Sequence, residues 1–179
     1  DLVLHCNSSP DSLVAFIKEN QNLNHLVKAD LSSHKGALDL FNQTCKLIGF
    51  PDAIINNAGI AESSPIEKET KEWSLEFDKT ISVNLKSPAI ICKEFILKKR
   101  KENISNRLRI INIASRAAFR GEVEDFISYA CSKGGVVSLT KTITRSFGIK
   151  DNVLAFSIAP GFVNTEMAKS FIRLTCMII

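Results

Sequence analysis

Short apolar segments alternate with longer amphipathic segments along the whole chain. The apolar segments have the length of buried strands, and they cover residues 2–6, 25–29, 52–56, 107–114 and 153–159. Between them, apolar residues recur every three or four positions, which predicts helices at about 10–20, 34–48, 67–101 and 129–148. Regular alternation of strands and helices is typical of a parallel sheet built from βα units.

The residues that flank these segments agree with the predicted helices. Ser8 or Ser9 can cap the helix that follows at Pro10, and Gly49 can end the helix at 34–48. We expect an interruption of the long helix near Thr80. The pattern predicts one α/β domain over residues 1–179, a doubly wound, Rossmann-like parallel sheet with helices on both faces, and it contains no internal repeat or linker.

Composition narrows the class of protein. With 45% hydrophobic and 23% charged residues the chain reads as an ordinary folded protein, which argues against disorder. The net charge of +4 has its local source in residues 98–101, at the end of a predicted helix where cations complement the helix dipole. No aromatic residues are interleaved with those charges, so we expect a solvated helix end and no nucleic-acid partner.

The cysteines and histidines exclude further classes of site. Five cysteines are odd in number and widely spaced, and no C-x-x-C pair occurs; they are Cys6, Cys45, Cys92, Cys131 and Cys176. The three histidines are scattered as well, so we expect no disulfide framework and no metal site. A reducing, cytoplasmic location fits this usage. No apolar run reaches about 18 residues, so we expect no membrane span.

The only tyrosine, Tyr129, precedes Lys133 by four positions in a predicted helix. Residues at this spacing lie on one helical face, with roughly 5–6 Å between their Cβ atoms. A nearby ammonium favours the phenolate, so Tyr129 can exchange a proton with a carbonyl or alcohol oxygen. Ser115, which ends an apolar run, can donate a hydrogen bond to the same oxygen. The alternative is a solvent-facing helix pair.

Small and polar residues collect where the predicted strands end. They are Asp30, residues 56–59, Ser115 and the pair Pro160-Gly161. In open α/β sheets the ligand crevice lies outside the carboxyl ends of the strands, so one crevice can hold all of them.

These motifs, in this order, resemble the short-chain dehydrogenase/reductase family over nearly the whole chain. The residues that carry the resemblance are Asp30, Asn56-Asn57-Ala58-Gly59, Val83-Asn84, Ile113-Ala114-Ser115, Tyr129-x-x-x-Lys133 and Pro160-Gly161-Phe162-Val163-Asn164-Thr165. Within the family, this chain is similar to the branch that includes 3-oxoacyl carrier-protein reductases. The resemblance implies an oxidoreductase that transfers hydride between NAD(P)(H) and a small carbonyl or alcohol substrate, with an acyl thioester as one substrate class of this branch.

The resemblance also implies the roles of single residues. Tyr129 is expected to be the general acid/base, Ser115 to position the substrate oxygen, Lys133 to assist the tyrosine and bind the nicotinamide ribose, and Asn84 to hold a water. The expected cofactor contacts are Asp30 and Leu31 at the adenine, Asn57, Ala58 and Gly59 beside the adenosine ribose, and Pro160, Gly161, Val163 and Thr165 at the nicotinamide.

The residue types leave simpler interpretations open. Asp30 can cap the following helix, Asn84 can be a surface amide, and Ser115 can be a turn residue. The pair Pro160-Gly161 can be a plain turn, and the acidic segment 122–125 can be a solvated loop or a substrate contact. We expect Cys131 to be packed and not nucleophilic.

The glycine-rich turn that family members carry after their first strand is absent from this sequence. By resemblance, segment 2–6 is the second strand, so we expect the first and last strands to lie outside this chain, which looks truncated at both ends. The first strand would be central, and its absence leaves a gap of roughly 9–10 Å without ladder bonds between segments 2–6 and 52–56.

The residues after segment 2–6 bear on the choice between NAD and NADP. Asn7-Ser8-Ser9 stands where an acidic residue favours NAD, so we expect NADP, with NAD as the alternative. We expect a homodimer or homotetramer, in which Ile90, Ile91, Phe95, Val137 and Ile143 form the interface or else face the sheet. The competing interpretation is a truncated, non-catalytic relative that acts as a binding or assembly module, and we expect residues 1–179 alone to bind cofactor poorly.

Overall fold

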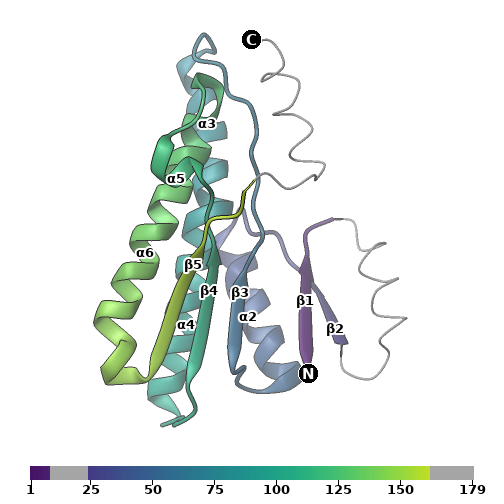
Figure 1. Cartoon of the computed structure of the whole chain (residues 1–179). Coiled ribbons are helices and arrows are strands. Elements are labelled where there is room, and N and C mark those ends of the chain that lie inside the picture. Colours follow the sequence, from purple (N-terminus) through teal and green to yellow (C-terminus); the bar gives the residue numbers. More distant parts are fainter. Residues whose placement is uncertain (9–23, 162–179) are drawn as a thin grey trace.

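The computed structural model describes residues 1–8 and 24–161, and these residues form the predicted alternation of strands and helices (Figure 1). The strands are β1 (Leu2–Cys6), β2 (Asn24–Lys28), β3 (Ala53–Asn56), β4 (Leu108–Ile113) and β5 (Val153–Ile158). The helices are α2 (His34–Ile48), α3 (Thr70–Ile81), α4 (Ser87–Lys101), α5 (Ala117–Arg120) and α6 (Ile127–Asp151). All five expected strands are confirmed; the helix expected at 10–20 lies outside the described residues.

The expected interruption near Thr80 is wrong in its form. The helix does not break: α3 continues through one π-helical turn, η1 (Ser82–Lys86), directly into α4. Pro88 accounts for this, because it has no N–H to donate to the carbonyl of Asn84 and its ring would clash with that carbonyl in an α-helix. A wider turn removes the conflict, and such turns are frequent at functional sites.

The segment between β4 and α6 contains two short helices that the pattern did not predict. They are α5 and the 3-10 turn η2 (Glu124–Phe126). Helix α6 also begins at Ile127, two residues before Tyr129. The elements α5 and η2 have only four and three residues, so they are too short for a hydrophobic period to be visible in the sequence.

The strands form two separate parallel sheets. One consists of β1 and β2, and the other has the order β3-β4-β5. Within residues 1–8 and 24–161, β1 pairs only with β2 and β3 pairs only with β4, so the facing edges of β1 and β3 lack ladder bonds (Figure 1). The predicted lack of ladder bonds between segments 2–6 and 52–56 is therefore confirmed in the described residues, and the predicted width of the gap stays a prediction.

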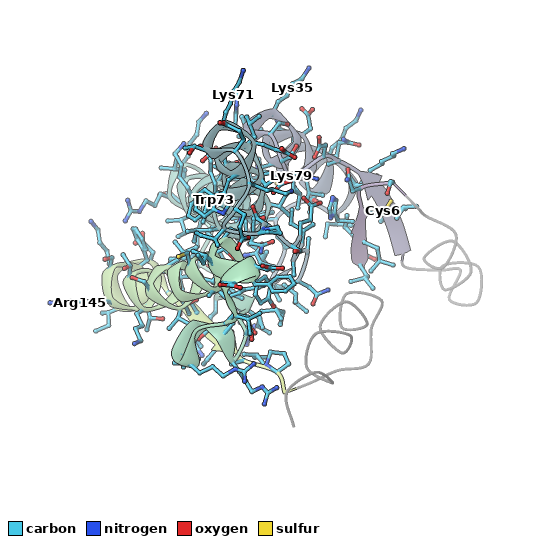
Figure 2. The ribbon with its side chains drawn as sticks, turned by 90° about the horizontal axis from the view of Figure 1, so that it is seen from above. Cys6, Lys35, Lys71, Trp73, Lys79 and Arg145 are labelled. Carbon is cyan, nitrogen blue, oxygen red and sulfur yellow. The ribbon has the colours of Figure 1, made fainter. Side chains whose placement is uncertain are left out.

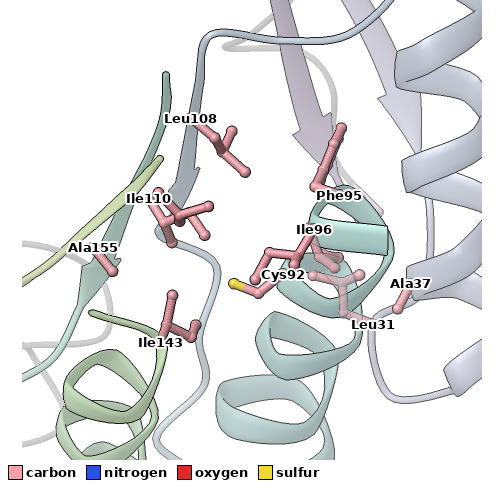
Figure 3. Packing of buried hydrophobic residues seen from close by; sticks show 11 residues of the cluster. Leu31, Ala37, Cys92, Phe95, Ile96, Leu108, Ile110, Ile143 and Ala155 are labelled. Carbon is pink, nitrogen blue, oxygen red and sulfur yellow. The ribbon is translucent and has the colours of Figure 1, made fainter. Parts of the chain in front are cut away.

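The main core lies between the three-stranded sheet and the long helices. Leu108, Ile110 and Ala155 of the sheet pack with residues of α4 and α6 (Figure 3). The apolar positions considered for an oligomer interface lie inside the chain. Ile91, Phe95 and Ile143 are at most 5% exposed in this core, and Ile90 packs against it. Val137 is 8% exposed in a second cluster with Ala114 and Val136. The alternative that they face the interior is thus the correct one.

A buried polar chain ties the ends of the strands to α6. Asn56 and Asn112 are register partners in β3 and β4, and Asn56 Nδ2 donates to Asn112 Oδ1 at 2.7 Å. Asn112 Nδ2 in turn donates to Thr140 Oγ1 at 2.8 Å. Asn112 is only 1% exposed, so these bonds satisfy groups that would otherwise be costly to bury. The chain fixes how α6 lies beneath the carboxyl ends of β3 and β4.

The basic end of α4 is only partly solvated. Lys98 pairs with Glu102 and Arg100 with Asp151, each at 2.6 Å. Lys99 contradicts the expectation, because it is 4% exposed and donates to the carbonyls of Ile104 and Asn106, which closes the turn after the helix. Other cations, among them Lys35, Lys71 and Arg145, point outward from different helices (Figure 2).

Gly36 provides a test of how tightly α2 packs on the turn after β2. A Cβ at Gly36 would lie 1.8 Å from the backbone oxygen of Asp30, and backbone cannot move aside without shifting the turn. We expect Gly36→Ala to lower the free energy of unfolding by about 2–3 kcal/mol. In the matched variant Gly148→Ala the Cβ has only an ordinary contact at 3.6 Å, so its better helix propensity should leave stability equal or slightly raised.

Urea unfolding of the two variants measures this difference directly. Equal midpoints for Gly36→Ala and Gly148→Ala would contradict the close contact between α2 and the Asp30 turn.

Candidate active site

Three of the predicted site segments follow neighbouring strands of the three-stranded sheet. Residue Asn57 follows β3, Ser115 follows β4 and Pro160 follows β5, and all three strands are parallel. The backbone N–H of Ala114 donates to the carbonyl of Ile158 at 2.7 Å, which holds the ends of β4 and β5 together. These segments therefore share one edge of the sheet, as expected. Val163 and Thr165 lie outside the described residues.

Tyr129 and Lys133 meet on the first turns of α6. The Nζ atom of Lys133 lies 5.7 Å from the centroid of the Tyr129 ring. Tyr129 is half-buried, and Lys133 is only 5% exposed. The alternative of a solvent-facing helix pair is therefore wrong.

The Lys133 side chain is hydrogen-bonded to strand β4 of the sheet. Its Nζ donates to the carbonyl of Ile113 at 2.8 Å, two residues before Ser115. Within the described part of the chain no carboxylate pairs with it, and burial lowers the pKa of Lys133 to about 8. A buried ammonium with one neutral partner keeps hydrogens available for hydroxyl groups of a ligand.

Ser115 is half-buried just after β4 and lies two residues before α5. Its Oγ accepts a hydrogen bond from the backbone N–H of Ala117 at 3.2 Å, so the hydroxyl hydrogen remains free to be donated elsewhere. The turn interpretation and the donor interpretation are therefore compatible.

Asn84 lies in the π-helical turn and is 1% exposed, so it is not a surface amide. Its Oδ1 accepts from the N–H of Ile60 at 2.8 Å, and its Nδ2 donates to the carbonyl of Ile60 at 2.8 Å. The same Nδ2 donates to Ser132 Oγ at 3.0 Å. Both side-chain hydrogens of Asn84 are thus engaged, and its expected contact with a water stays a prediction.

Gly59 brings the turn after β3 against these two residues. A Cβ at Gly59 would lie 3.3 Å from Asn84 Oδ1 and 3.4 Å from Lys133 Nζ. The 3.3 Å distance is tighter than most Cβ contacts, so a larger residue at position 59 would require the Asn84 amide to shift by a few tenths of an ångström. Gly59, Asn84 and Lys133 are therefore neighbours, although they come from three different elements.

The turn after β2 contains Asp30, which does not cap α2. Ser33 is the cap, and its Oγ accepts from the N–H of Gly36 at 3.0 Å. Asp30 instead accepts two hydrogen bonds from Ser32, at 2.9 Å each, and these bonds lower the pKa of its carboxyl group. The exposed Asp30 carboxylate keeps further lone pairs for a ligand.

The expected cofactor contact of Leu31 stays a prediction. Its side chain is 6% exposed and belongs to the hydrophobic core (Figure 3). Its carbonyl accepts from Ser87 Oγ at 2.6 Å. Any contact of Leu31 with a ligand would therefore involve its backbone.

The acidic segment before Tyr129 includes a structural tie. Asp125 Oδ2 accepts from Ser63 Oγ at 2.9 Å, and the Asp125 carbonyl accepts from the N–H of Ser64 at 2.8 Å. These bonds join the loop after Gly59 to the segment that leads into α6. Within 122–125, Glu122 pairs with Arg120 at 3.0 Å, so neither carboxylate is simply solvated.

Ser132 is the residue of this site that the sequence did not identify. It is fully buried, and its Oγ donates to the carbonyl of Tyr129 at 2.7 Å while accepting from Asn84. Its place between Tyr129 and Lys133 was visible in the sequence. Its partner, 48 positions away, was not.

Together these groups can supply a proton and bind a flat ligand with hydroxyl groups. The Tyr129 hydroxyl can serve as an acid or base, the Ser115 hydroxyl can serve as a neutral donor, and Lys133 is a cation beside the close approach at Gly59. This donor set fits a nicotinamide ribose. Among the described residues no cluster of His, Cys, Asp or Glu could hold a metal ion, and no helix is long and apolar enough to cross a membrane.

Comparisons with known proteins agree with this geometry. The family model described as short chain dehydrogenase matches residues 1–173. An uncharacterized oxidoreductase of Thermotoga maritima is 33% identical over 152 residues, which are 82% of this chain and 55% of that protein. The 3-oxoacyl-[acyl-carrier-protein] reductase of Aquifex aeolicus is 28% identical over 143 residues, which are 80% of this chain and 54% of that protein.

A solved structure has the same fold. It is 4-hydroxyisoleucine dehydrogenase in complex with NADH, with a TM-score of 0.81 and 28% identity, covering 98% of this chain and 68% of that one. The chain spans about half the length of the curated relatives it matches.

Proposed function

This chain belongs to the short-chain dehydrogenase family, and from that premise we propose that it serves hydride transfer between a nicotinamide cofactor and a carbonyl or alcohol substrate. One observation carries the proposal. Lys133 is buried beside the Tyr129 ring, and the turn at Gly59 and the strand end before Ser115 both approach it. A cation buried this deeply without a carboxylate partner is costly unless a ligand uses it.

Each residue then has a definite task. When bound, the cofactor supplies or accepts the hydride. Tyr129 gives a proton to the carbonyl oxygen in reduction and takes it back in oxidation, and Ser115 donates its free hydrogen to the same oxygen. Lys133 favours the phenolate and binds the ribose hydroxyl groups. Gly59 has no side chain, so the turn after β3 can lie close to Asn84 and Lys133 without a Cβ between them.

We propose NADP as the preferred cofactor and NAD as the alternative. Asn7 and Ser8 follow β1. Neither has a carboxylate that could accept a hydrogen bond from the ribose 2′-hydroxyl of NAD. Both preferences occur among similar proteins, because a pterin aldehyde reductase of Arabidopsis thaliana is NADPH-dependent and 4-hydroxyisoleucine dehydrogenase is complexed with NADH. We propose a small carbonyl compound as substrate, and an acyl thioester because similar proteins include acetoacetyl-CoA reductase of Acinetobacter.

The test is oxidation of NADPH and NADH by the full-length protein with a panel of ketones and 3-oxoacyl thioesters. We expect turnover with at least one substrate and a higher kcat/KM for NADPH. Turnover with NADH alone would overturn the cofactor preference. Failure to bind either nucleotide would overturn the proposed function.

A non-catalytic binding or assembly module is the second candidate, and the split sheet favours it. Nicotinamide binding without any turnover would support this candidate. We further propose a homodimer or homotetramer and a cytoplasmic location. The cysteines Cys6, Cys45, Cys92 and Cys131 are all unpaired, which is usual in a reducing compartment.

A further inference from the structure

Ser132 connects two elements of the site through one buried hydroxyl group. It is 0% exposed, its Oγ donates to the carbonyl of Tyr129, and it accepts from Asn84 Nδ2 at 3.0 Å. The bond to Tyr129 fixes the rotamer of the serine on α6. The hydroxyl is thereby aimed at the π-helical turn.

The π-helical turn is itself anchored on its other side. The Asn84 amide makes two bonds to the backbone of Ile60, in the loop that follows Gly59. Asn84 therefore links the loop after β3 to α6. Within the described part of the chain, Ser132 is the only residue of α6 to which the Asn84 side chain is hydrogen-bonded.

Gly135 allows the two elements to meet. It follows Ser132 by three positions, so both lie on the same side of α6. A Cβ at Gly135 would lie 2.5 Å from Leu85 Cδ2, and Leu85 is the residue next to Asn84. At Gly134 a Cβ would have no neighbour closer than 3.9 Å. The contact between α6 and the π-helical turn is thus tight at Gly135 and Ser132 alike.

We infer that Ser132 is a positioning residue that fixes the register of α6 against the π-helical turn. Tyr129 and Lys133 lie on the same turns of α6 as Ser132, so a slip of α6 moves both relative to Gly59 and to the end of β4. Small displacements of reacting groups reduce rates strongly while binding surfaces at a distance stay intact. This inference rests on the proposed function of Tyr129 and Lys133.

The first test is Ser132→Ala in the full-length protein. We expect kcat to fall about tenfold while the Kd of the nicotinamide cofactor changes less than about twofold. Ser128→Ala is the matched control. Ser128 lies one turn earlier on α6, is 3% exposed and has no hydrogen-bond partner for its hydroxyl in the described structure, so kcat should stay within about twofold of the wild type.

A double-mutant cycle separates positioning from general destabilisation. If Ser132 acts through Asn84, the variant Asn84→Ala already loses the contact, and adding Ser132→Ala should reduce kcat by less than about a further twofold. If Ser132 only supported the helix, the factors by which the two single substitutions lower kcat would multiply in the double variant.

Gly135→Ala disturbs the same contact without touching Ser132, which keeps the test informative if Ser132→Ala folds poorly. We expect a lower kcat for Gly135→Ala and an unchanged kcat for Gly134→Ala. Unchanged kcat in Ser132→Ala or Gly135→Ala, or multiplying losses in the cycle, would overturn the inference while wild-type turnover leaves the proposed function standing. A wild type that neither binds nor oxidises the nucleotides would overturn both.

Discussion

Replacing Tyr129 by Phe is expected to reduce kcat by about 100- to 10,000-fold, the range in which general acid/base groups contribute. The substitution removes one hydroxyl group and keeps the ring against Lys133. Because the ring contact survives, the affinity for the nicotinamide cofactor should change less than about threefold. Steady-state oxidation of NADPH gives kcat, and a fluorescence titration of NADPH gives the Kd.

Cys131 provides the control for this variant. It is exposed, so the expectation that Cys131 is packed is wrong. It lies two positions after Tyr129, so Cys131→Ser tests whether any polar change near the tyrosine is harmful, and whether the thiol takes part in catalysis. We expect kcat of Cys131→Ser within about twofold of the wild type. A Tyr129→Phe variant that kept more than about a tenth of the wild-type kcat would remove Tyr129 from the proton-transfer role.

Replacing Lys133 by Met is expected to make the protein more stable and inactive. Lys133 is 5% exposed, and its ammonium has one neutral acceptor at 2.8 Å. Burial lowers its pKa from 10.5 to about 8, which means that the fold disfavours the charged form. An apolar side chain of similar length avoids that cost. We expect the free energy of unfolding at pH 7 to rise by about 1–3 kcal/mol and kcat to fall by at least about 100-fold.

The stability gain should depend on pH in a defined direction. Between the folded pKa of about 8 and the unfolded pKa of 10.5, the unfolded chain binds more protons at Lys133 than the folded chain does. The wild-type free energy of unfolding therefore rises with pH across this window through Lys133. Since Met does not titrate, the advantage of Lys133→Met is fully present below about pH 8 and shrinks above it.

Urea unfolding at several pH values measures this difference between variant and wild type. Lys141→Met is the matched control, because Lys141 lies on the same helix and is exposed, so its removal should change stability by less than about 0.5 kcal/mol. A loss of stability for Lys133→Met at pH 7 would show that the ammonium has a better partner in the apoprotein than the Ile113 carbonyl.

The sequence predicted the strands, the long helices and the edge of the sheet where Tyr129, Lys133 and Ser115 belong, because those features follow from periodicity and from parallel topology. It failed where tertiary contacts decide. Lys99 looked like part of a solvated cationic run, but two carbonyls after α4 hold it inside. The π-helical turn before Pro88 follows from proline chemistry. The partner of Ser132 depends on packing between distant segments.

The split between the two sheets has a consequence for how the chain opens. With no ladder between β1 and β3 in the described structure, α2 makes the main contacts with the β1-β2 pair among the described elements. Cooperative unfolding spreads through shared hydrogen bonds and core contacts, so the pair should exchange its amide hydrogens with solvent well before β4, which is bonded on both sides. The chain should behave as two foldons, with the β1-β2 pair opening first.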